Sequence, residues 1–448
     1  MADTPEPRRA FGFWICLALV MGNMIGSGVF LLPAALAPYG WNAILGWIVT
    51  IAGALCLAYV FACLARHFPR AGGPYAYTRE AFGTAPAFAV AWSYWISVWT
   101  ANATIAVAAV SYLSHFLPAL AAAPGLVAIG LVLSFTLINC LSVKAAGEVQ
   151  LLTTILKLLP LLAAITLTLL IAGTGDRPDA VPLPTSGISL AGVTATAALT
   201  LWAMVGFESA TIPTGHIRDP QRTIPRATMI GTLATGLVYL IACSGVALLL
   251  PPEQAAASNA PFADFIGRYW GSGPASFVAL FAAISALGAL NGWVLIQGEM
   301  PVALARDGVF PSWIGKRSPA GTPVRAHLVS AALVALLLLA NQSRSMGELF
   351  AFMALLSTVA SLVAYLACSA GALKLQGERR VERSFALAAA AGAGSLYAAW
   401  AIYGAGAEPA LWGGALLASG LPVYFIMRRS LLGRGSAGID PSPNVDQG

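Results

Sequence analysis

Long apolar blocks alternate with short polar segments along almost the whole chain. A helix needs about 20 apolar residues to cross the ~30 Å hydrocarbon core of a bilayer. One such block fits a soluble helical core, but twelve in series do not. The pattern therefore predicts an all-α polytopic membrane protein with twelve transmembrane helices, at residues 13–38, 43–66, 86–116, 124–143, 149–173, 189–215, 227–250, 275–305, 325–341, 348–373, 384–404 and 409–427.

The blocks define one membrane domain over residues 13–427. The first block is too long for a signal-peptide core, so we predict that it is a retained span. The N-terminal arm, residues 1–12, is short and polar, and the tail, residues 428–448, is expected to be disordered.

Composition agrees with this class. Of the 448 residues, 58% are hydrophobic and only 9% are charged, whereas a soluble protein carries about 25% charged residues. With the N-terminus in the cytoplasm, twenty of the 24 Lys and Arg residues fall on the cytoplasmic side. This asymmetry predicts that both termini are cytoplasmic. It also explains the net charge of +6, and no nucleic-acid partner is expected.

Other classes of protein find little support. The six cysteines lie in apolar blocks without metal-ligand spacing and are expected to pack as small hydrophobes. The four histidines lie near the ends of predicted spans, so neither an intramembrane protease nor a metal site or other cofactor is expected. The apolar spans lack the continuous polar lining of a channel, and the tails are short for a sensor.

The first block contains an unusual polar interruption, GNMIGSGVFLLP, at Gly22–Pro33. Lipid offers no water to satisfy freed backbone groups, so irregular backbone at this depth needs protein around it. The sixth block repeats the feature in VGFESATIPTG, residues 205–215. Two broken helices five spans apart predict two inverted five-helix repeats around a binding site at the membrane midplane. Close packing at Gly22 and Gly26 is the alternative explanation, but it does not account for the polar neighbours.

Three charged residues lie within the predicted spans: Lys157, Glu208 and Glu299. Such residues are costly in a membrane, by at least ~2.5 kcal/mol at its centre, and often functional. Lys157 is predicted to lie about 12 Å from the cytoplasmic interface. The alternative to a functional role is that its side chain snorkels to that interface. Glu208 is deeper and predicts a functional role, whereas Glu299 lies close enough to the cytoplasm to be solvated there.

Two tryptophans, Trp202 and Trp293, lie far from the ends of their spans. Interfacial tryptophans usually lie near the ends, so these two are expected to pack in the core or to form the walls of a ligand site. In a dry pocket, an indole face binds a cation by ~2 kcal/mol or more.

Several motifs together resemble those of the amino acid–polyamine–organocation transporter family, and within it the arginine/agmatine and putrescine/ornithine antiporters. The resemblance covers nearly the whole chain and is densest at GNMIGSGVFLLPA, GGPYAY, LWAMVGFESA, DPQRTIPRA, GALNGW, DGVFP and AGTPV. It implies a five-plus-five inverted repeat in helices 1–10, with helices 1 and 6 discontinuous and helices 11–12 additional.

The resemblance also implies site residues. Those expected to bind substrate are Asn23, Met24, Gly26, Ser27, Gly28, Ser97, Asn102, Ile105, Ala203, Val205, Trp293 and Ser357. Those expected to act as gates are Tyr75, Tyr94, Trp202 and Phe350. Glu208 corresponds to an acidic residue implicated in pH sensing, and Lys157 is expected to take part in proton coupling.

Three features depart from the antiporter pattern. Ser97, Val98 and Ile105 change the distal pocket, and Gln297 and Glu299 change the chemistry beyond Trp293. Lys157 instead resembles permeases and exchangers of the same superfamily, in which the ammonium replaces a coupling sodium ion.

The resemblance implies a secondary transporter in the bacterial inner membrane that works by alternating access. The first expectation is exchange of an arginine-like cationic amino acid for an agmatine-like amine. The alternative is a proton-coupled permease or exporter of neutral amino acids that uses Lys157 in place of sodium. The expected partners are the small-molecule substrate and the lipid bilayer, with protons and a second copy of the chain as further candidates.

Overall fold

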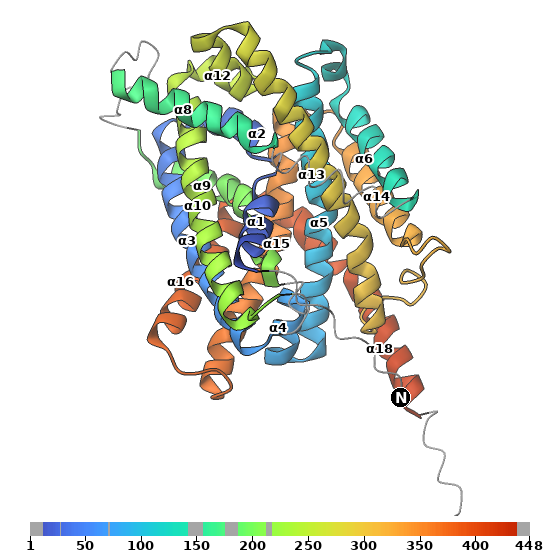
Figure 1. Cartoon of the computed structure of the whole chain (residues 1–448). Helices are drawn as coiled ribbons and strands as arrows, with labels where there is room; N and C mark the ends of the chain where they lie inside the picture. Colours follow the sequence, from blue (N-terminus) through green and yellow to red (C-terminus); the bar gives the residue numbers. More distant parts are fainter. Residues whose placement is uncertain are drawn as a thin grey trace, which may run out of the picture.

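A computed structural model describes residues 12–26, 28–69, 72–141, 156–174, 187–211 and 217–436. This described part is built of helices, and no strand occurs in it (Figure 1). The α-helices are α1 Phe13–Met24, α2 Gly28–Leu36, α3 Trp41–His67, α4 Gly73–Phe82, α5 Thr84–Leu113, α6 Pro124–Leu141, α8 Leu158–Thr174, α9 Leu190–Met204, α10 Pro220–Leu249, α11 Pro252–Ala257, α12 Pro261–Trp270, α13 Ser272–Arg306, α14 Val324–Ala340, α15 Met346–Gly377, α16 Phe385–Gly404, α17 Ala407–Ala418 and α18 Gly420–Ser436.

The predicted polytopic membrane fold is confirmed. Within the described residues, nine helical segments are long and apolar enough to cross a membrane, and the pair α1 and α2, bent by 45°, makes up to ten. Two shorter apolar helices, α8 and α14, lie in the predicted fifth and ninth blocks. Each predicted block thus contains an apolar helix.

The helix boundaries differ from the predicted spans in several places. α10 begins at Pro220 rather than near residue 227, because a proline in the first turn of a helix is well tolerated. The last predicted block consists of two helices, α17 and α18, and α18 continues to Ser436. α18 thus extends past residue 428, where the tail was expected to begin.

Three helices were not expected from the apolar pattern: α4, α11 and α12. They are only 6 to 10 residues long, too short for the 20-residue pattern of a span. In Figure 1, α4 lies at one end of the molecule and α12, together with α8, at the opposite end.

α5 forms the centre of the bundle and packs side by side with α13 and α15 (Figure 1). Of its apolar window, 94% is buried, against 28% for α6 and 11% for residues 407–428. The alanine-rich second half of α5 allows neighbouring helices to approach closely. α5 is therefore the central helix of the bundle, and α6, α17 and α18 present apolar faces to the lipid.

Candidate functional site

The backbone is broken between α1 and α2. The Ile25 amide donates to the carbonyl of Met21 at 2.7 Å, and the Gly26 amide turns back to the carbonyl of Met24 at 2.8 Å. In a continuous helix the Gly26 amide would bond to Gly22. The break therefore releases the Gly22 carbonyl to other donors. Ser27, which was expected to bind substrate, lies outside the described residues.

α9 is broken at the corresponding place. It ends at Met204, and Gly206 then has a φ of +115°, beyond which the short 3₁₀ helix η3, Phe207–Thr211, begins. A Cβ atom added to Gly206 would lie 3.2 Å from the carbonyl carbon of Asn23. The two breaks therefore pack against each other, and glycine is needed at this position both for its φ and for the close approach.

We expect Gly206→Ala to lower the stability of the protein by about 1–3 kcal/mol, because alanine is strained at this φ, and to slow transport strongly. Thermal unfolding and uptake into liposomes measure the two effects. Gly130→Ala is the matched control, since a Cβ on Gly130 in α6 meets nothing within 4 Å. Equal stability and activity of the two variants would contradict the close packing of the breaks.

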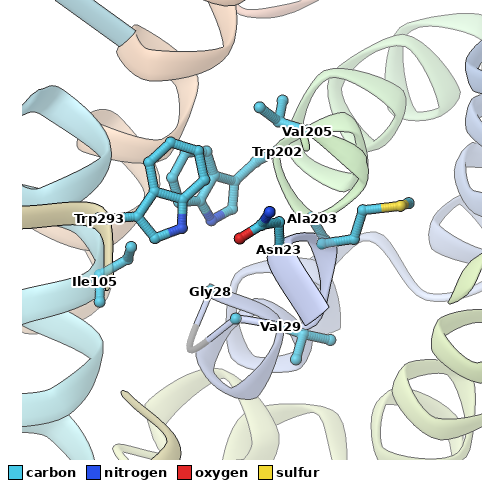
Figure 2. A pocket seen from close by; sticks show the side chains of 10 residues that line it. Asn23, Gly28, Val29, Ile105, Trp202, Ala203, Val205 and Trp293 are labelled. Atoms are coloured by element: carbon cyan, nitrogen blue, oxygen red, sulfur yellow. The ribbon is translucent and has the colours of Figure 1, made fainter. Parts of the chain in front are cut away.

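A cavity lies between the two breaks (Figure 2). Its lining is Asn23, Met24, Gly26, Gly28, Val29, Ile105, Trp202, Ala203, Val205 and Trp293. The cavity is small, about 20 Å³, which is room for about one water molecule. The indoles of Trp202 and Trp293 occupy the space beside it (Figure 2), so a larger ligand fits only when these side chains move.

The ends of two helices make one side of the cavity favourable for negative charge and the other side favourable for positive charge. Gly28 and Val29 begin α2, where the first four backbone amides have no partner within the helix. Ala203 and Val205 lie at the end of α9, where carbonyls are left without partners in the same way. A helix N-terminus favours negative charge and a C-terminus favours positive charge. The cavity thus suits a molecule that carries a carboxylate and an ammonium close together.

Trp202 lies directly over the start of α2. A Cβ on Gly28 would overlap the indole Nε1 of Trp202. Within the described residues that Nε1 is buried and has no hydrogen-bond partner. A buried indole N–H normally finds an acceptor, so Trp202 offers a free donor at the edge of the cavity.

Most of the residues predicted to bind substrate line the cavity, but three do not. The hydroxyl of Ser97 bonds to the Tyr94 carbonyl of its own helix at 2.7 Å. The hydroxyl of Ser357 donates to the Ser97 carbonyl at 2.9 Å and joins α15 to α5. Asn102 bonds to Gln297 on α13. None of the three is part of the cavity lining. The side chain of Ser97 is held within α5, whereas those of Ser357 and Asn102 bond to neighbouring helices. Their role in substrate binding stays a prediction.

The predicted gates are dispersed. Trp202 lines the cavity, whereas Phe350 is fully buried in α15 and is absent from the lining. Tyr75 lies on α4, where its hydroxyl accepts a hydrogen bond from Arg79 at 3.3 Å and burial raises its pKa. Val29 lines the cavity but was not expected to, although its place beside Gly28 in the first turn of α2 was a usable signal.

Glu208 is fully buried just after the break in α9. Its carboxylate accepts hydrogen bonds from the hydroxyl of Tyr94 at 2.9 Å and from that of Tyr365 at 2.8 Å. The amide of Gly206 adds a third at 3.2 Å. Several donors stabilise a charged carboxylate away from water. Glu208 therefore connects the break to α5 and α15 without lining the cavity itself.

Lys157 contacts the first break, between α1 and α2. It directly precedes α8, rather than lying inside a continuous helix as expected, and only 4% of it is exposed. Its Nζ donates to the released carbonyl of Gly22. The ammonium is thus buried on the backbone of the break, which argues against snorkelling to the membrane surface.

Glu299 has a different environment. It forms a two-pronged ion pair with Arg317, with Nη1–Oε1 at 3.0 Å and Nη2–Oε2 at 2.5 Å. Both side chains are about one-third exposed. Glu299 holds the loop after α13 against that helix and does not face the cavity.

A bundle of apolar helices with a small cavity between two helix breaks is typical of a membrane transporter. The family model described as "Amino acid permease" matches residues 11–427. The chain belongs to this amino acid permease family. It is therefore a multi-pass membrane transporter and not an enzyme.

Curated relatives extend over most of the chain. A cadaverine/lysine antiporter of Escherichia coli K12 is 33% identical over 392 residues, which cover 82% of this chain and 84% of the relative. A putative arginine/ornithine antiporter of Bacillus subtilis is 30% identical, with 83% and 85% covered. The putrescine transporter PotE of Escherichia coli K12 is 28% identical, with 91% and 93% covered.

Proposed function

We propose that this protein is an antiporter that exchanges a basic amino acid for a related cationic amine or amino acid by alternating access. The observation that carries the proposal is the cavity between the N-terminus of α2 and the C-terminus of α9. The carboxylate of the substrate binds near Asn23–Gly28, and its α-ammonium binds near Ala203–Val205.

The side chain of the substrate extends toward Trp293 and Ile105, which line the cavity beside the breaks. An indole face attracts a cation, which favours a positively charged end. The relatives are named for lysine, cadaverine, arginine, ornithine and putrescine. Their names extend the first expectation, arginine for agmatine, to lysine or ornithine and the corresponding diamines.

The proposed architecture has twelve spans, made of the long apolar helices, the bent pair α1 and α2, and the shorter α8 and α14. Helices 1–5 and 6–10 form inverted repeats, supported by the matching breaks after Met24 and Met204. Both termini are cytoplasmic, residues 13–427 form the transporter domain, and the protein forms a homodimer.

Trp202, Tyr94, Tyr75 and Phe350 act as gates in this proposal. Trp202 closes the cavity over Gly28. Glu208 couples substrate access to pH, since proton uptake by its carboxylate would disturb the hydrogen bonds from Tyr94 and Tyr365.

Exchange of substrates across the membrane of proteoliposomes tests the proposed antiport. Proteoliposomes are loaded with lysine, ornithine, arginine, cadaverine, putrescine or agmatine, and uptake of each labelled compound is measured. We expect uptake at least tenfold faster with a basic counter-substrate inside than without one. Equal uptake from empty liposomes, driven by a proton gradient, would overturn the exchange mechanism.

One observation favours a second candidate, the proton-coupled permease of neutral amino acids. The ammonium of Lys157 lies on the backbone of the first break, where it takes the place of a coupling cation. The same assay with labelled alanine or leucine, with and without a proton gradient, separates this candidate from the antiporter.

A further inference from the structure

Two buried carboxamides join α5 to α13 beside the cavity. Asn102 and Gln297 are both essentially unexposed, and the Nδ2 of Asn102 donates to the Oε1 of Gln297 at 2.8 Å. The sequence resemblance implies that Asn102 binds substrate, but it assigns no role to Gln297.

The helical repeat places this pair next to the cavity wall. Ile105 follows Asn102 by three residues on α5, and Trp293 precedes Gln297 by four residues on α13. Residues three or four apart share one face of a helix. Since Ile105 and Trp293 both line the cavity, the carboxamide pair lies one helical turn beyond it on both helices.

The pair leaves one acceptor and one donor free. Within the described residues, neither the Oδ1 of Asn102 nor the Nε2 of Gln297 has a hydrogen-bond partner, although both atoms are buried. Leaving such groups without partners is unfavourable, so each uncommitted atom marks a place for a ligand group or a bound water. Because the Nδ2 of Asn102 donates to Gln297, Oδ1 is the atom of the Asn102 carboxamide that can still bind a ligand.

The backbone at Gln297 is itself held in place by α14, with support from α5. Its backbone carbonyl accepts a hydrogen bond from the hydroxyl of Ser330 on α14 at 3.3 Å, and that hydroxyl accepts one from the indole of Trp95 on α5 at 3.2 Å. The imidazole of His327 packs on the adjacent Gly298, where a Cβ would overlap it. This part of α13 is therefore fixed, as a residue that orients another must be.

We propose that Gln297 is a positioning residue for substrate selection: it turns the carboxamide of Asn102 so that Oδ1 accepts a hydrogen bond from a distal ammonium of the substrate. This inference rests on the proposed function. It explains how a cavity whose lining contains no carboxylate selects a cationic side chain. Trp293 supplies the aromatic face, and the oriented amide oxygen supplies the acceptor.

The test compares lysine with norleucine, which has the same carbon chain but lacks the distal ammonium. Binding of each to the purified protein in nanodiscs is measured by calorimetry. We expect the wild type to bind lysine at least tenfold more tightly than norleucine. Gln297→Met, which keeps the length but not the acceptor, is expected to reduce this ratio about tenfold and to leave norleucine affinity unchanged. Gln297→Glu keeps an acceptor for Asn102 and is expected to restore most of the ratio.

A matched control disturbs a similar amide pair whose two residues do not line the cavity. The Nδ2 of Asn139 on α6 donates to the Oδ1 of Asn291 on α13 at 3.0 Å, so Asn139→Leu should leave the ratio unchanged. In an Asn102→Leu background, Gln297→Met should cause no further loss, because Gln297 acts through Asn102.

The possible outcomes separate the two proposals. If Gln297→Met leaves the ratio of lysine to norleucine affinity unchanged, or lowers both affinities equally, the positioning role is overturned and the proposed function stands. A wild type that binds norleucine as tightly as lysine overturns the proposed function and this inference with it.

Discussion

Trp293→Ala is expected to weaken the binding of lysine or arginine about 30-fold or more. Trp293 projects from α13 into the cavity beside Asn23 and Ile105 (Figure 2). A cation on the face of a desolvated indole gains about 2 kcal/mol or more, and each 1.4 kcal/mol corresponds to about a factor of ten in affinity. Calorimetry on the purified protein, with lysine and with norleucine, measures the loss.

Two further variants show whether the loss comes from the indole face. Trp293→Phe keeps a weaker aromatic face and should bind with intermediate affinity. Trp270→Ala removes a tryptophan that is 41% exposed on α12, far along the chain from the breaks, and should bind like the wild type. Lysine affinity that is unchanged in Trp293→Ala would remove cation binding by the indole from the mechanism.

The two breaks were predictable because their signal is local. Glycine, serine and asparagine within an apolar block mark a place where a membrane helix cannot continue unsupported. The structure has α1 ending at Met24, inside the first segment singled out in the sequence, and α9 ending at Met204, one residue before the second segment. The contact between Gly206 and Asn23 was not predictable, since no periodicity links residues so far apart.

The hydrogen bonds between polar side chains of different helices could not be predicted from the sequence either. Asn102 and Gln297 are 195 residues apart, and Glu208 and Tyr365 are 157 apart. The first pair forms because α13 packs against α5, and the second because the 3₁₀ helix η3 that follows the break in α9 lies against α15. The apolar pattern shows which segments enter the membrane but not how each helix is rotated about its axis. For this reason the hydrogen bond from the Ser357 hydroxyl to the Ser97 carbonyl, which joins α15 to α5, could not be predicted.

Lys157→Met is expected to slow exchange at least tenfold while substrate affinity changes much less. Methionine keeps the length of the side chain but removes the ammonium that donates to the carbonyl of Gly22. A buried carbonyl left without a donor costs about 1–3 kcal/mol, and this carbonyl belongs to the break that must rearrange during transport. Exchange rates in proteoliposomes and calorimetric affinities, measured on the same preparation, give the two quantities.

Lys374→Met is the matched control, because the Nζ of Lys374 also donates to a backbone carbonyl, that of Ala81 at 2.6 Å, but at the protein surface. It should exchange like the wild type, and equal rates in the two variants would contradict a special role for Lys157. The pattern of loss in Lys157→Met also decides between the mechanisms. A uniform loss of exchange means that the ammonium supports the rearrangement of the break itself. A loss confined to uptake driven by a proton gradient means that Lys157 serves proton coupling, as in the alternative permease.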